Sequence, residues 1–579
     1  MKATGARIIV KLIEREGVRY VAGIPGGANL PLYDALYDSE LRHVLARHEQ
    51  GAGFIAQGMA RSTGKPGVCI ATSGPGATNL MTAIADAKLD SVPLVAITGQ
   101  VSRSLLGTDA FQEVDTYGMC LPLVKHSYLV RSARELLDAV PEAFRIAASG
   151  RPGPVLLDVP KDVQLEEIEV EAWPEPSRAD APAMPEPEAL ERAAALIAES
   201  KRPFLYFGGG VTAAGAHEEL AALSRKASIP AAATLMGLGC LPPEHPLYLG
   251  MIGMHGSRAV NALVEEADLL IAVGARFDDR ATGDVRRFAR GARILHIDAD
   301  AAEIGKIKRV DAFIRADARE ALAGLASLVP ARGESAWTKR ARSLMASSSL
   351  AKPPSASHPL EIVRAIAAAA GPDAIVTTDV GQHQMWAAQA YPVSRPRSFL
   401  SSGGLGTMGF GLPAAIGAAL ANPGRRVVCI TGDGSILMNV QELATLAELG
   451  LDLSVFVFDN GHLGLVRQQQ ELFYEGRYSA SRFDSRLDFA AIARGFGIPA
   501  EKVEAGGGST EAIGRALPAR GPSFLAIGIR EEDNVLPMVP PGGANMEAIP
   551  EETGRYGALA AVPEAALRRG SPRAIAKEA

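Results

Sequence analysis

The sequence predicts an α/β protein of three consecutive domains, each a doubly wound parallel sheet with helices on both faces. Short apolar strand candidates alternate with helix-length segments along nearly the whole chain, which is typical of parallel sheets. Two polar, proline-containing stretches interrupt the alternation. With 579 residues and 47% hydrophobic content, the chain suffices for about three or four domains of roughly 150 residues, each with its own core.

The domain boundaries follow from these interruptions. We expect an N-terminal domain over residues 1–165, a central domain over 185–335 and a C-terminal domain over 358–550, joined by linkers at 166–184 and 336–357. After Pro550 the sequence is rich in Ala, Glu and Arg without a clear strand, so a loose tail is expected over 551–579.

The first two domains contain regularly spaced elements. An amphipathic helix is predicted over about residues 5–16, so we expect no signal or transit peptide before it. The clearest strand candidates are 67–71, 94–97 and 155–159 in the N-terminal domain, and 203–207, 269–273 and 293–297 in the central domain.

Glu49 is a candidate functional residue with two interpretations. The charged run Arg47-His48-Glu49-Gln50 directly precedes a helix of small apolar residues. A solvated acid at a helix end is the commonest fate of a single glutamate. Alternatively, Glu49 is a buried carboxylate that shares a proton with a ring nitrogen of a ligand.

The C-terminal domain contains the most informative local pattern. The apolar strand 427–430 leads into the turn Gly432-Asp433-Gly434-Ser435, and the next strand, 453–458, ends at Asp459-Asn460. Carboxylate and amide oxygens beside backbone N–H groups suit a Mg²⁺ ion that holds a diphosphate.

The segment 404–409 (GLGTMG) supports a competing interpretation. It matches GxGxxG, and Asp433 ends the next strand, where a dinucleotide-binding fold places its ribose-binding acid. A nicotinamide dehydrogenase is therefore an alternative. The glycines beside Asp433 and the pair Asp459-Asn460 favour metal and diphosphate binding, because a dinucleotide site does not need that pair.

Composition excludes several other classes. The net charge of −6 gives no electrostatic case for nucleic acid. Four scattered cysteines without a CxxC pair indicate neither a zinc site nor a disulfide framework, and a reducing cytoplasm is expected. The nearly uncharged stretch 403–421 is interrupted by glycines and Pro413, so it predicts a buried loop and a core helix rather than a membrane span.

Several motifs together carry a family resemblance. In chain order they are GIPGGA (23–28), RHE (47–49), TSGPGATN (72–79), GTDAFQE (107–113), DVPKDVQ (158–164), GMHG (253–256), GARFDDR (274–280), GQHQMW (381–386) and residues 402–413. Over about residues 5–545 the chain resembles the catalytic subunits of acetohydroxyacid (acetolactate) synthases. The resemblance implies the three-domain fold of thiamine diphosphate-dependent decarboxylases and carboligases.

The resemblance implies how thiamine diphosphate and Mg²⁺ are bound. Glu49 would hydrogen-bond the pyrimidine ring, Met408 would support the bend of the cofactor, and the Gly406 carbonyl would accept from its amino group. Asp433, Asn460 and the backbone carbonyl of His462 would bind Mg²⁺. The other implied thiamine diphosphate contacts are Gly26, Gly432, Gly434 and Ser435.

The implied reaction is carboligation in branched-chain amino acid biosynthesis. Pyruvate loses CO₂, and its remaining two-carbon unit joins a second pyruvate or 2-ketobutyrate. Arg276 is the candidate partner of the acceptor carboxylate, because a guanidinium suits a planar carboxylate. Gln112 and Phe111 would line the pocket; Lys161 would line it too, or is an ordinary lysine at a strand end.

Two positions depart from the commoner family pattern. Many relatives have tryptophan where this chain has Gln469, and that indole packs against the extra methyl group of 2-ketobutyrate. We therefore expect little preference for 2-ketobutyrate over pyruvate. Asp459 replaces a more usual asparagine, which leaves Asn460 available as the metal ligand.

The resemblance also implies FAD in the central domain, in a structural or vestigial role because the reaction has no net redox change. A glycine-rich loop with solvated charges is the alternative for each single element. The implied FAD residues are Arg151, Gly208, Gly209, Thr234, Met236, Met254, His255, Gly274, Arg276, Asp278, Arg280, Asp298 and Asp317.

The implied assembly is a homodimer or tetramer with active sites between subunits, paired with a small regulatory subunit. Three alternatives to the synthase stay open. A pyruvate oxidase type would share both cofactors but consume oxygen or reduce a quinone. A carboligase with another 2-keto acid acceptor is the second alternative. Glyoxylate is disfavoured as that acceptor, because relatives specialised for it have an apolar residue at the position of Glu49. A non-catalytic paralogue is disfavoured by intact Glu49, Asp433 and Asn460.

Overall fold

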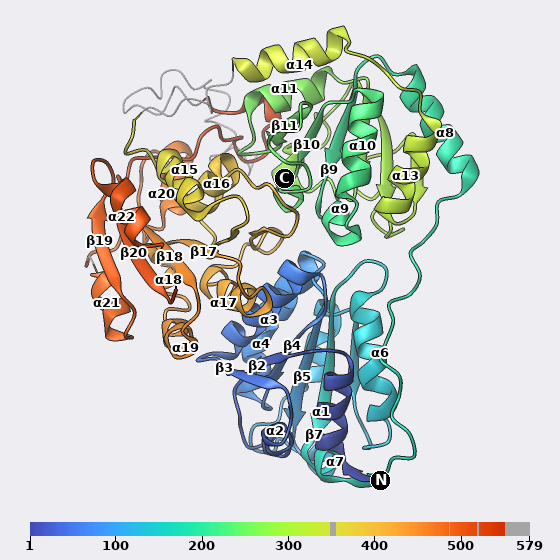
Figure 1. Ribbon diagram of the computed structural model, residues 1–579, viewed down its shortest axis with the longest axis vertical. Helices are drawn as coiled ribbons and strands as arrows, with labels where there is room; N and C mark the ends of the chain where they lie inside the picture. Colours follow the sequence, from blue (N-terminus) through green and yellow to red (C-terminus); the bar gives the residue numbers. More distant parts are fainter. Residues whose placement is uncertain (348–354, 486, 518–519, 551–579) are drawn as a thin grey trace.

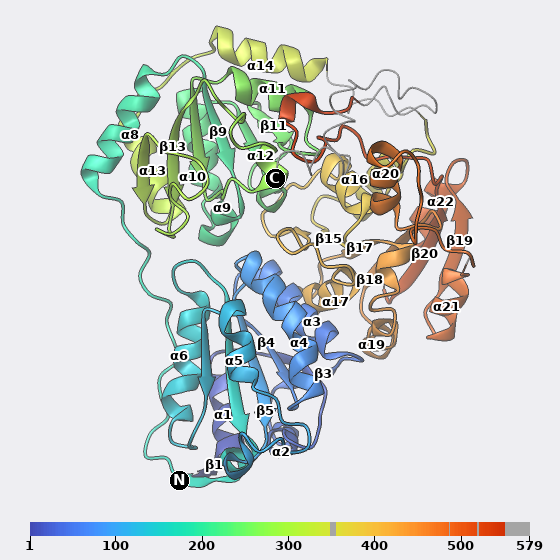
Figure 2. The same cartoon turned by 180° about the vertical axis from the view of Figure 1, so that it is seen from behind.

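The computed structural model describes residues 1–347, 355–485, 487–517 and 520–550. Three α/β domains lie at the corners of a triangle (Figures 1 and 2). Each domain contains a six-stranded parallel sheet with helices on both faces, which confirms the predicted fold class. The expected tail, residues 551–579, and part of the second expected linker lie outside the described residues.

The N-terminal sheet has the strand order β3-β2-β4-β5-β7-β6. Its strands are β2 (Tyr20–Gly23), β3 (Arg42–Leu45), β4 (Gly67–Ala71), β5 (Leu94–Gln100), β6 (His126–Leu129) and β7 (Pro154–Pro160). Its helices are α1 (Gly5–Arg15), α2 (Leu30–Tyr37), α3 (Glu49–Thr63), α4 (Pro75–Leu89), α5 (Thr116–Cys120), α6 (Leu136–Ala148) and α7 (Lys161–Leu165), with 3₁₀ turns at Arg103–Leu105 and Leu121–Leu123. The antiparallel pair β1 (Lys2–Thr4) and β8 (Glu167–Glu169) closes the domain, so the chain leaves it a few residues later than expected.

The central sheet has the strand order β11-β10-β9-β12-β13-β14, the order of dinucleotide-binding folds. Its strands are β9 (Pro203–Phe207), β10 (Ala231–Ala233), β11 (Tyr248–Met251), β12 (Leu269–Val273), β13 (Arg293–Asp298) and β14 (Ala312–Arg315). Its helices are α8 (Pro187–Glu199), α9 (Gly209–Ala214), α10 (His217–Ala227), α11 (Arg258–Glu266), α12 (Asp279–Thr282), α13 (Ala318–Leu328) and α14 (Ala336–Ala346), with a 3₁₀ turn at Leu235–Gly237.

Helix α14 differs from the linker expected over 336–357. Trp337 and Ala341 are buried in the central core, and the Trp337 indole N–H donates to the Pro203 carbonyl at 2.8 Å. The first part of that range therefore belongs to the central domain, because the helix buries an apolar face there.

The C-terminal sheet has the strand order β16-β15-β17-β18-β20-β19. Its strands are β15 (Ile375–Thr378), β16 (Phe399–Leu400), β17 (Val427–Gly432), β18 (Leu453–Asp459), β19 (Ala500–Glu504) and β20 (Ser523–Gly528). Its helices are α15 (Pro359–Ala370), α16 (Gln382–Ala390), α17 (Gly411–Ala421), α18 (Asp433–Ile436), α19 (Glu442–Leu449), α20 (Gly464–Phe473), α21 (Phe489–Gly495) and α22 (Ser509–Arg515). After β20 the chain returns to the central domain, where it forms a 3₁₀ turn at Asn545–Glu547 and the Asn545 amide donates to the Ala281 carbonyl at 2.9 Å.

Helices α3 and α17 pack together between the N-terminal and C-terminal domains (Figure 1). Phe54 and Phe410 meet edge to face, with ring centroids 5.3 Å apart. A Cβ atom on Gly417 would lie 1.9 Å from the Ile55 carbonyl oxygen, so only glycine permits this close approach. The stretch 403–421 therefore contains the predicted core helix. The loop before it was expected to be buried, but Gly404, Leu405 and Gly406 are exposed. No helix among the described residues is long and apolar enough to cross a membrane.

Candidate active site and cofactor cavities

The first candidate site lies where the strand order of the C-terminal sheet reverses, between β15 and β17. Ligands of open α/β sheets bind in the crevice at such a point. A cavity of about 170 Å³ opens there between the loops that follow β15, β17 and β18. It is lined by residues that include Gly381, His383, Gly406, Met408, Gly432, Asp433, Gly434, Ser435, Asn460 and His462.

Asp433 is the central polar group of this cavity. Its Oδ1 accepts from the Gly434 N–H at 2.8 Å, and its Oδ2 accepts from the N–H groups of Gly461 (2.7 Å) and His462 (3.2 Å). Burial raises the pKa of Asp433 to about 7, and the negative charge of Asp459 acts in the same direction. A cation beside Asp433 would offset this cost of burying a carboxylate.

The neighbouring groups fit the predicted Mg²⁺ and diphosphate. Within the described ranges, no three His, Cys, Asp or Glu side chains cluster to hold a metal, but the predicted ligands combine one carboxylate, one amide and one backbone carbonyl. The Asn460 amide nitrogen donates to Gln382 Oε1 at 3.1 Å, which orients the amide oxygen. Buried His383 has no partner for Nε2 in the described chain, so it is available to a phosphate oxygen. The sequence motif 381–386 contained this histidine without revealing its role.

The second candidate site lies at the corresponding reversal of the N-terminal sheet, between β2 and β4. Glu49, the first residue of α3, accepts a 2.9 Å hydrogen bond on Oε2 from the amide nitrogen of Asn79 on α4. Gly26 lies against Thr72, which follows β4, because a Cβ atom on Gly26 would meet that side chain at 2.6 Å. Asn79 was part of a motif, but its contact with Glu49 depends on how two helices pack.

Of the residues predicted to line the substrate pocket beside Glu49, only some lie close to it in the structure. Gln112 packs against the loop before α4, since its carbonyl oxygen lies 2.8 Å from the position of a Cβ atom on Gly74. The adjacent Phe111 is 88% exposed. Lys161 follows β7 at the same edge of the sheet, and no contact there decides between its two interpretations.

Other predicted residues lie elsewhere. Glu49 does not line the cavity that contains Asp433, so the two carboxylates do not share this cavity within a single chain. Gln469 does not line it either, although it lies on the same face of α20 as Leu465 and Val466, which do. Arg276, predicted for the acceptor carboxylate, lines a cavity of the central domain.

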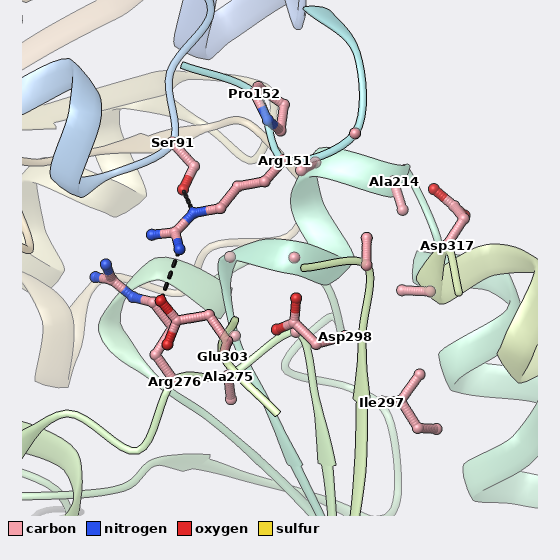
Figure 3. A pocket seen from close by; sticks show the side chains of 18 of the residues that line it. Ser91, Arg151, Pro152, Ala214, Ala275, Arg276, Ile297, Asp298, Glu303 and Asp317 are labelled. Atoms are coloured by element: carbon pink, nitrogen blue, oxygen red, sulfur yellow. Dashed lines mark hydrogen bonds and ion pairs between the residues drawn. The ribbon is translucent and has the colours of Figure 1, made fainter. Parts of the chain in front are cut away.

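The third candidate site is this central cavity of about 450 Å³, at the reversal between β9 and β12 (Figure 3). A Cβ atom on Gly274 would lie 2.5 Å from Gly210 Cα, so the two loops approach too closely for a side chain. Burial raises the pKa of Asp298, at the end of β13, to about 6. The predicted residues that line the cavity are Arg151, Gly208, Gly209, Thr234, Met236, Gly274, Arg276, Asp278, Asp298 and Asp317.

Arg151 reaches this cavity from the N-terminal domain. Its Nε donates to Ser91 Oγ at 2.9 Å, and its Nη1 donates to Glu303 Oε1 at 2.7 Å (Figure 3). The same Nη1 donates to Asp300 Oδ2 at 3.1 Å. The side chain therefore joins two domains. Ser91 and Glu303 were not predicted, because their roles depend on how the domains pack.

Three residues predicted for the flavin do not line the cavity: Met254, His255 and Arg280. His255 Nδ1 is 3.1 Å from the Pro537 carbonyl oxygen, and the Met254 carbonyl accepts from the Val539 N–H at 3.0 Å. These contacts place Met254 and His255 against the chain segment that returns from the C-terminal domain.

Comparison with known proteins agrees with the three domains. Residues 3–119, 190–325 and 379–527 match, in that order, the N-terminal TPP binding domain, the central domain and the C-terminal TPP binding domain of thiamine pyrophosphate enzymes. The fold and its sites thus define a thiamine pyrophosphate enzyme.

Individual relatives are similar over nearly their full length. "Acetolactate synthase isozyme 1 large subunit" of Escherichia coli (strain K12) is 53% identical over 95% of this chain and 98% of its own. "Probable acetolactate synthase large subunit" of Methanocaldococcus jannaschii is 47% identical, over 93% and 94%. "Acetolactate synthase 1, chloroplastic" of Zea mays is 46% identical, over 95% and 89%. The chain belongs to the family of acetolactate synthase large subunits.

Proposed function

We propose that this chain catalyses the acetolactate synthase reaction of valine, leucine and isoleucine biosynthesis. One pyruvate loses CO₂, and the two-carbon unit joins a second pyruvate to give acetolactate or 2-ketobutyrate to give acetohydroxybutyrate. The observation that carries this proposal is the buried Asp433 cavity, at the switch point of the C-terminal sheet, in a chain whose relatives are named acetolactate synthases.

Thiamine diphosphate with Mg²⁺ is the proposed cofactor of this cavity. When bound, it supplies the electron sink on which a 2-keto acid can lose CO₂. Asp433, Asn460 and the His462 carbonyl would hold the metal, and His383 Nε2 would bind a phosphate oxygen. Glu49, oriented by Asn79, would hold a proton at the pyrimidine ring nitrogen.

FAD is the proposed ligand of the central cavity. The support is the dinucleotide-type strand order, the close approach of the loops at Gly274 and the acid Asp298 at the end of β13. A guanidinium suits a phosphate group, so Arg151 and Arg276 are the candidate diphosphate ligands. The flavin would serve the structure, because the reaction has no net redox change.

We propose that two copies of the chain complete each active site. Glu49 does not line the Asp433 cavity of its own chain, and Phe111 beside the Glu49 site is 88% exposed. Both observations agree with a second copy that covers the Glu49 site. The printed names of the relatives as large subunits support a further small regulatory partner.

A cytoplasmic location is also part of the proposal. Its support is that all four cysteines are buried free thiols, which suits a reducing compartment.

Product analysis with an oxygen electrode tests the proposed reaction. The purified protein would receive pyruvate, thiamine diphosphate, Mg²⁺ and FAD, with and without 2-ketobutyrate. We expect acetolactate and acetohydroxybutyrate without oxygen uptake, and loss of both products in Glu49→Ala. Oxygen uptake with acetate or acetyl phosphate as product would instead identify an oxidase.

A further inference from the structure

The loop over residues 402–411 brings Gly406 and Met408 to the diphosphate cavity. Asp379, in the same domain, fixes the second half of this loop: its Oδ1 accepts from the Gly409 N–H at 2.8 Å. The first half is fixed by side chains of the N-terminal domain.

Two aspartates at the C-terminal end of α4 bind the first half of the loop. Asp90 Oδ1 accepts from the Gly404 N–H at 2.7 Å, and Asp90 Oδ2 accepts from the Gly403 N–H at 3.0 Å. Asp86 Oδ1 accepts from the Thr407 hydroxyl at 3.2 Å. Both aspartate side chains are 0% exposed.

Arg61 on α3 holds the two aspartates together. Its Nη2 lies 2.8 Å from Asp86 Oδ2 and 2.9 Å from Asp90 Oδ2, and its side chain is 6% exposed. Its Nη1 donates to the Ser401 carbonyl at 3.0 Å, directly before the loop. The guanidinium also lies over the Phe410 ring, 4.9 Å from its centroid. One cation therefore contacts both acids and both ends of the loop.

Such a buried ion cluster is an inefficient way to stabilise a fold, because desolvation of the charges offsets most of their attraction. Its bonds end instead on backbone and side-chain groups on both sides of Gly406. We propose that Arg61, Asp86 and Asp90 are positioning residues that hold the loop in the conformation that binds thiamine diphosphate. This inference rests on the proposed function, and it places the control of one cofactor loop in a different domain of the same chain.

Calorimetric titration of the cofactor-free, full-length protein with thiamine diphosphate and Mg²⁺ tests the proposal. Asp86→Asn and Asp90→Asn keep the side-chain shape but remove the charge and one acceptor. We expect each to raise the Kd of thiamine diphosphate by about tenfold or more, since a bond to a charged group has been lost.

The matched control is Asp158→Asn. Asp158 is an equally buried aspartate of the N-terminal domain that bonds to Thr98 and Gln100 and not to the loop. We expect this variant to keep the wild-type Kd, although thermal unfolding shows a change in stability comparable to that of the other variants. A general loss of stability would instead change the Kd in all three variants together.

A milder variant covers the case in which the aspartate variants do not fold. Thr407→Val removes one hydroxyl bond to Asp86 and leaves the ion cluster intact, and we expect a Kd about threefold higher. Wild-type affinity in every folded aspartate variant overturns the positioning role alone. If neither aspartate variant folds, wild-type affinity in Thr407→Val overturns it. If the wild-type protein does not bind thiamine diphosphate, the proposed function fails as well.

Discussion

Asp433 and Asp459 share one backbone N–H group, that of Gly461, which lies 2.7 Å from Asp433 Oδ2 and 3.3 Å from Asp459 Oδ1. Both carboxylates are buried, and burial with the charge of Asp459 raises the pKa of Asp433 to about 7. Asp433 lines the candidate active-site cavity of the C-terminal domain. Asp459 lines a neighbouring cavity, and Asp433 lines that cavity too. Asp459 therefore adds negative charge behind the candidate metal ligand.

This relationship predicts how Mg²⁺ binding depends on pH. Mg²⁺ displaces a proton from Asp433, so the Mg²⁺ affinity should rise with pH and level off above about pH 7. Asp459→Asn removes a repelling charge, lowers the pKa of Asp433 and should shift this midpoint to lower pH. At pH 8.5 the variant should bind Mg²⁺ about fivefold more weakly, because less negative charge attracts the cation.

The Mg²⁺ concentration for half-maximal binding of thiamine diphosphate, measured from pH 5.5 to 8.5, checks this prediction. Asp484→Asn is the control, because Asp484 lines the neighbouring cavity but is exposed. The same midpoint in wild type and Asp459→Asn would contradict the coupling between the two carboxylates.

Gln469→Trp should increase the preference for 2-ketobutyrate over pyruvate. The side chain at 469 lies on the same face of α20 as Leu465 and Val466, so an indole there would extend the apolar wall. An apolar contact with one extra methylene is worth about 1–3 kcal/mol, or roughly tenfold and more in product ratio. Competition between the two acceptors at equal concentrations measures this ratio. An unchanged ratio would show that position 469 does not face the acceptor.

Asp158 should make folding stability depend on pH. Burial raises its pKa from 3.8 to about 7, although hydrogen bonds from Thr98 and Gln100 oppose the shift. The folded protein therefore binds a proton more tightly than the unfolded chain. This stabilisation, on the order of 4 kcal/mol, is fully present below about pH 4 and is lost as the pH rises through about 7.

Chemical denaturation of wild type and Asp158→Asn between pH 4.5 and 8 checks this prediction. Asparagine cannot titrate, so the difference in unfolding free energy between the two proteins should change by a few kcal/mol across this range. Other titrating groups cancel in the comparison. A constant difference would mean that Asp158 stays charged in the folded protein.

Gly274→Ala should reduce flavin retention. Its φ of +54° is unfavourable for alanine, and the added Cβ atom would lie 2.5 Å from Gly210 Cα, so the loops must separate. We expect the flavin absorbance of the purified protein to fall at least severalfold and the melting temperature to drop. Gly291→Ala is the control, since a Cβ atom there would meet nothing within 4 Å. Full flavin content in Gly274→Ala would contradict this use of the cavity.

The parallel sheets could be predicted from the sequence because the alternation of short apolar strands with helix-length segments is visible locally along the chain. Strand order is not local, so the dinucleotide-type order of the central sheet appeared only in the structure. Helix α14 escaped prediction because it buries little beyond Trp337 and Ala341. Its burial depends on the surface that the central domain offers, which no local pattern contains.

The candidate site was also predictable only in part: the residues at the strand ends were predicted, and the contacts between domains were not. Asp433 and Asn460 directly follow two strands that are consecutive in the chain. Because these strands pair in parallel, their ends lie at the same edge of the sheet, which brings the two residues to one cavity. The contacts of Asp86 and Asp90 with the loop before α17 join the N-terminal and C-terminal domains, between residues more than three hundred apart in sequence. Such contacts arise from domain packing. The same packing explains why Met254 and His255 contact the returning chain segment.

The stoichiometry of the reaction tests the central claim most directly. Carbon-13 NMR of the purified protein with labelled pyruvate, thiamine diphosphate, Mg²⁺ and FAD would follow substrate, CO₂ and products together. The proposed function predicts that two pyruvates disappear for each CO₂ and each acetolactate formed. One CO₂ for each pyruvate, with acetate or acetaldehyde as the product, would contradict the proposed synthase and indicate an oxidase or a simple decarboxylase.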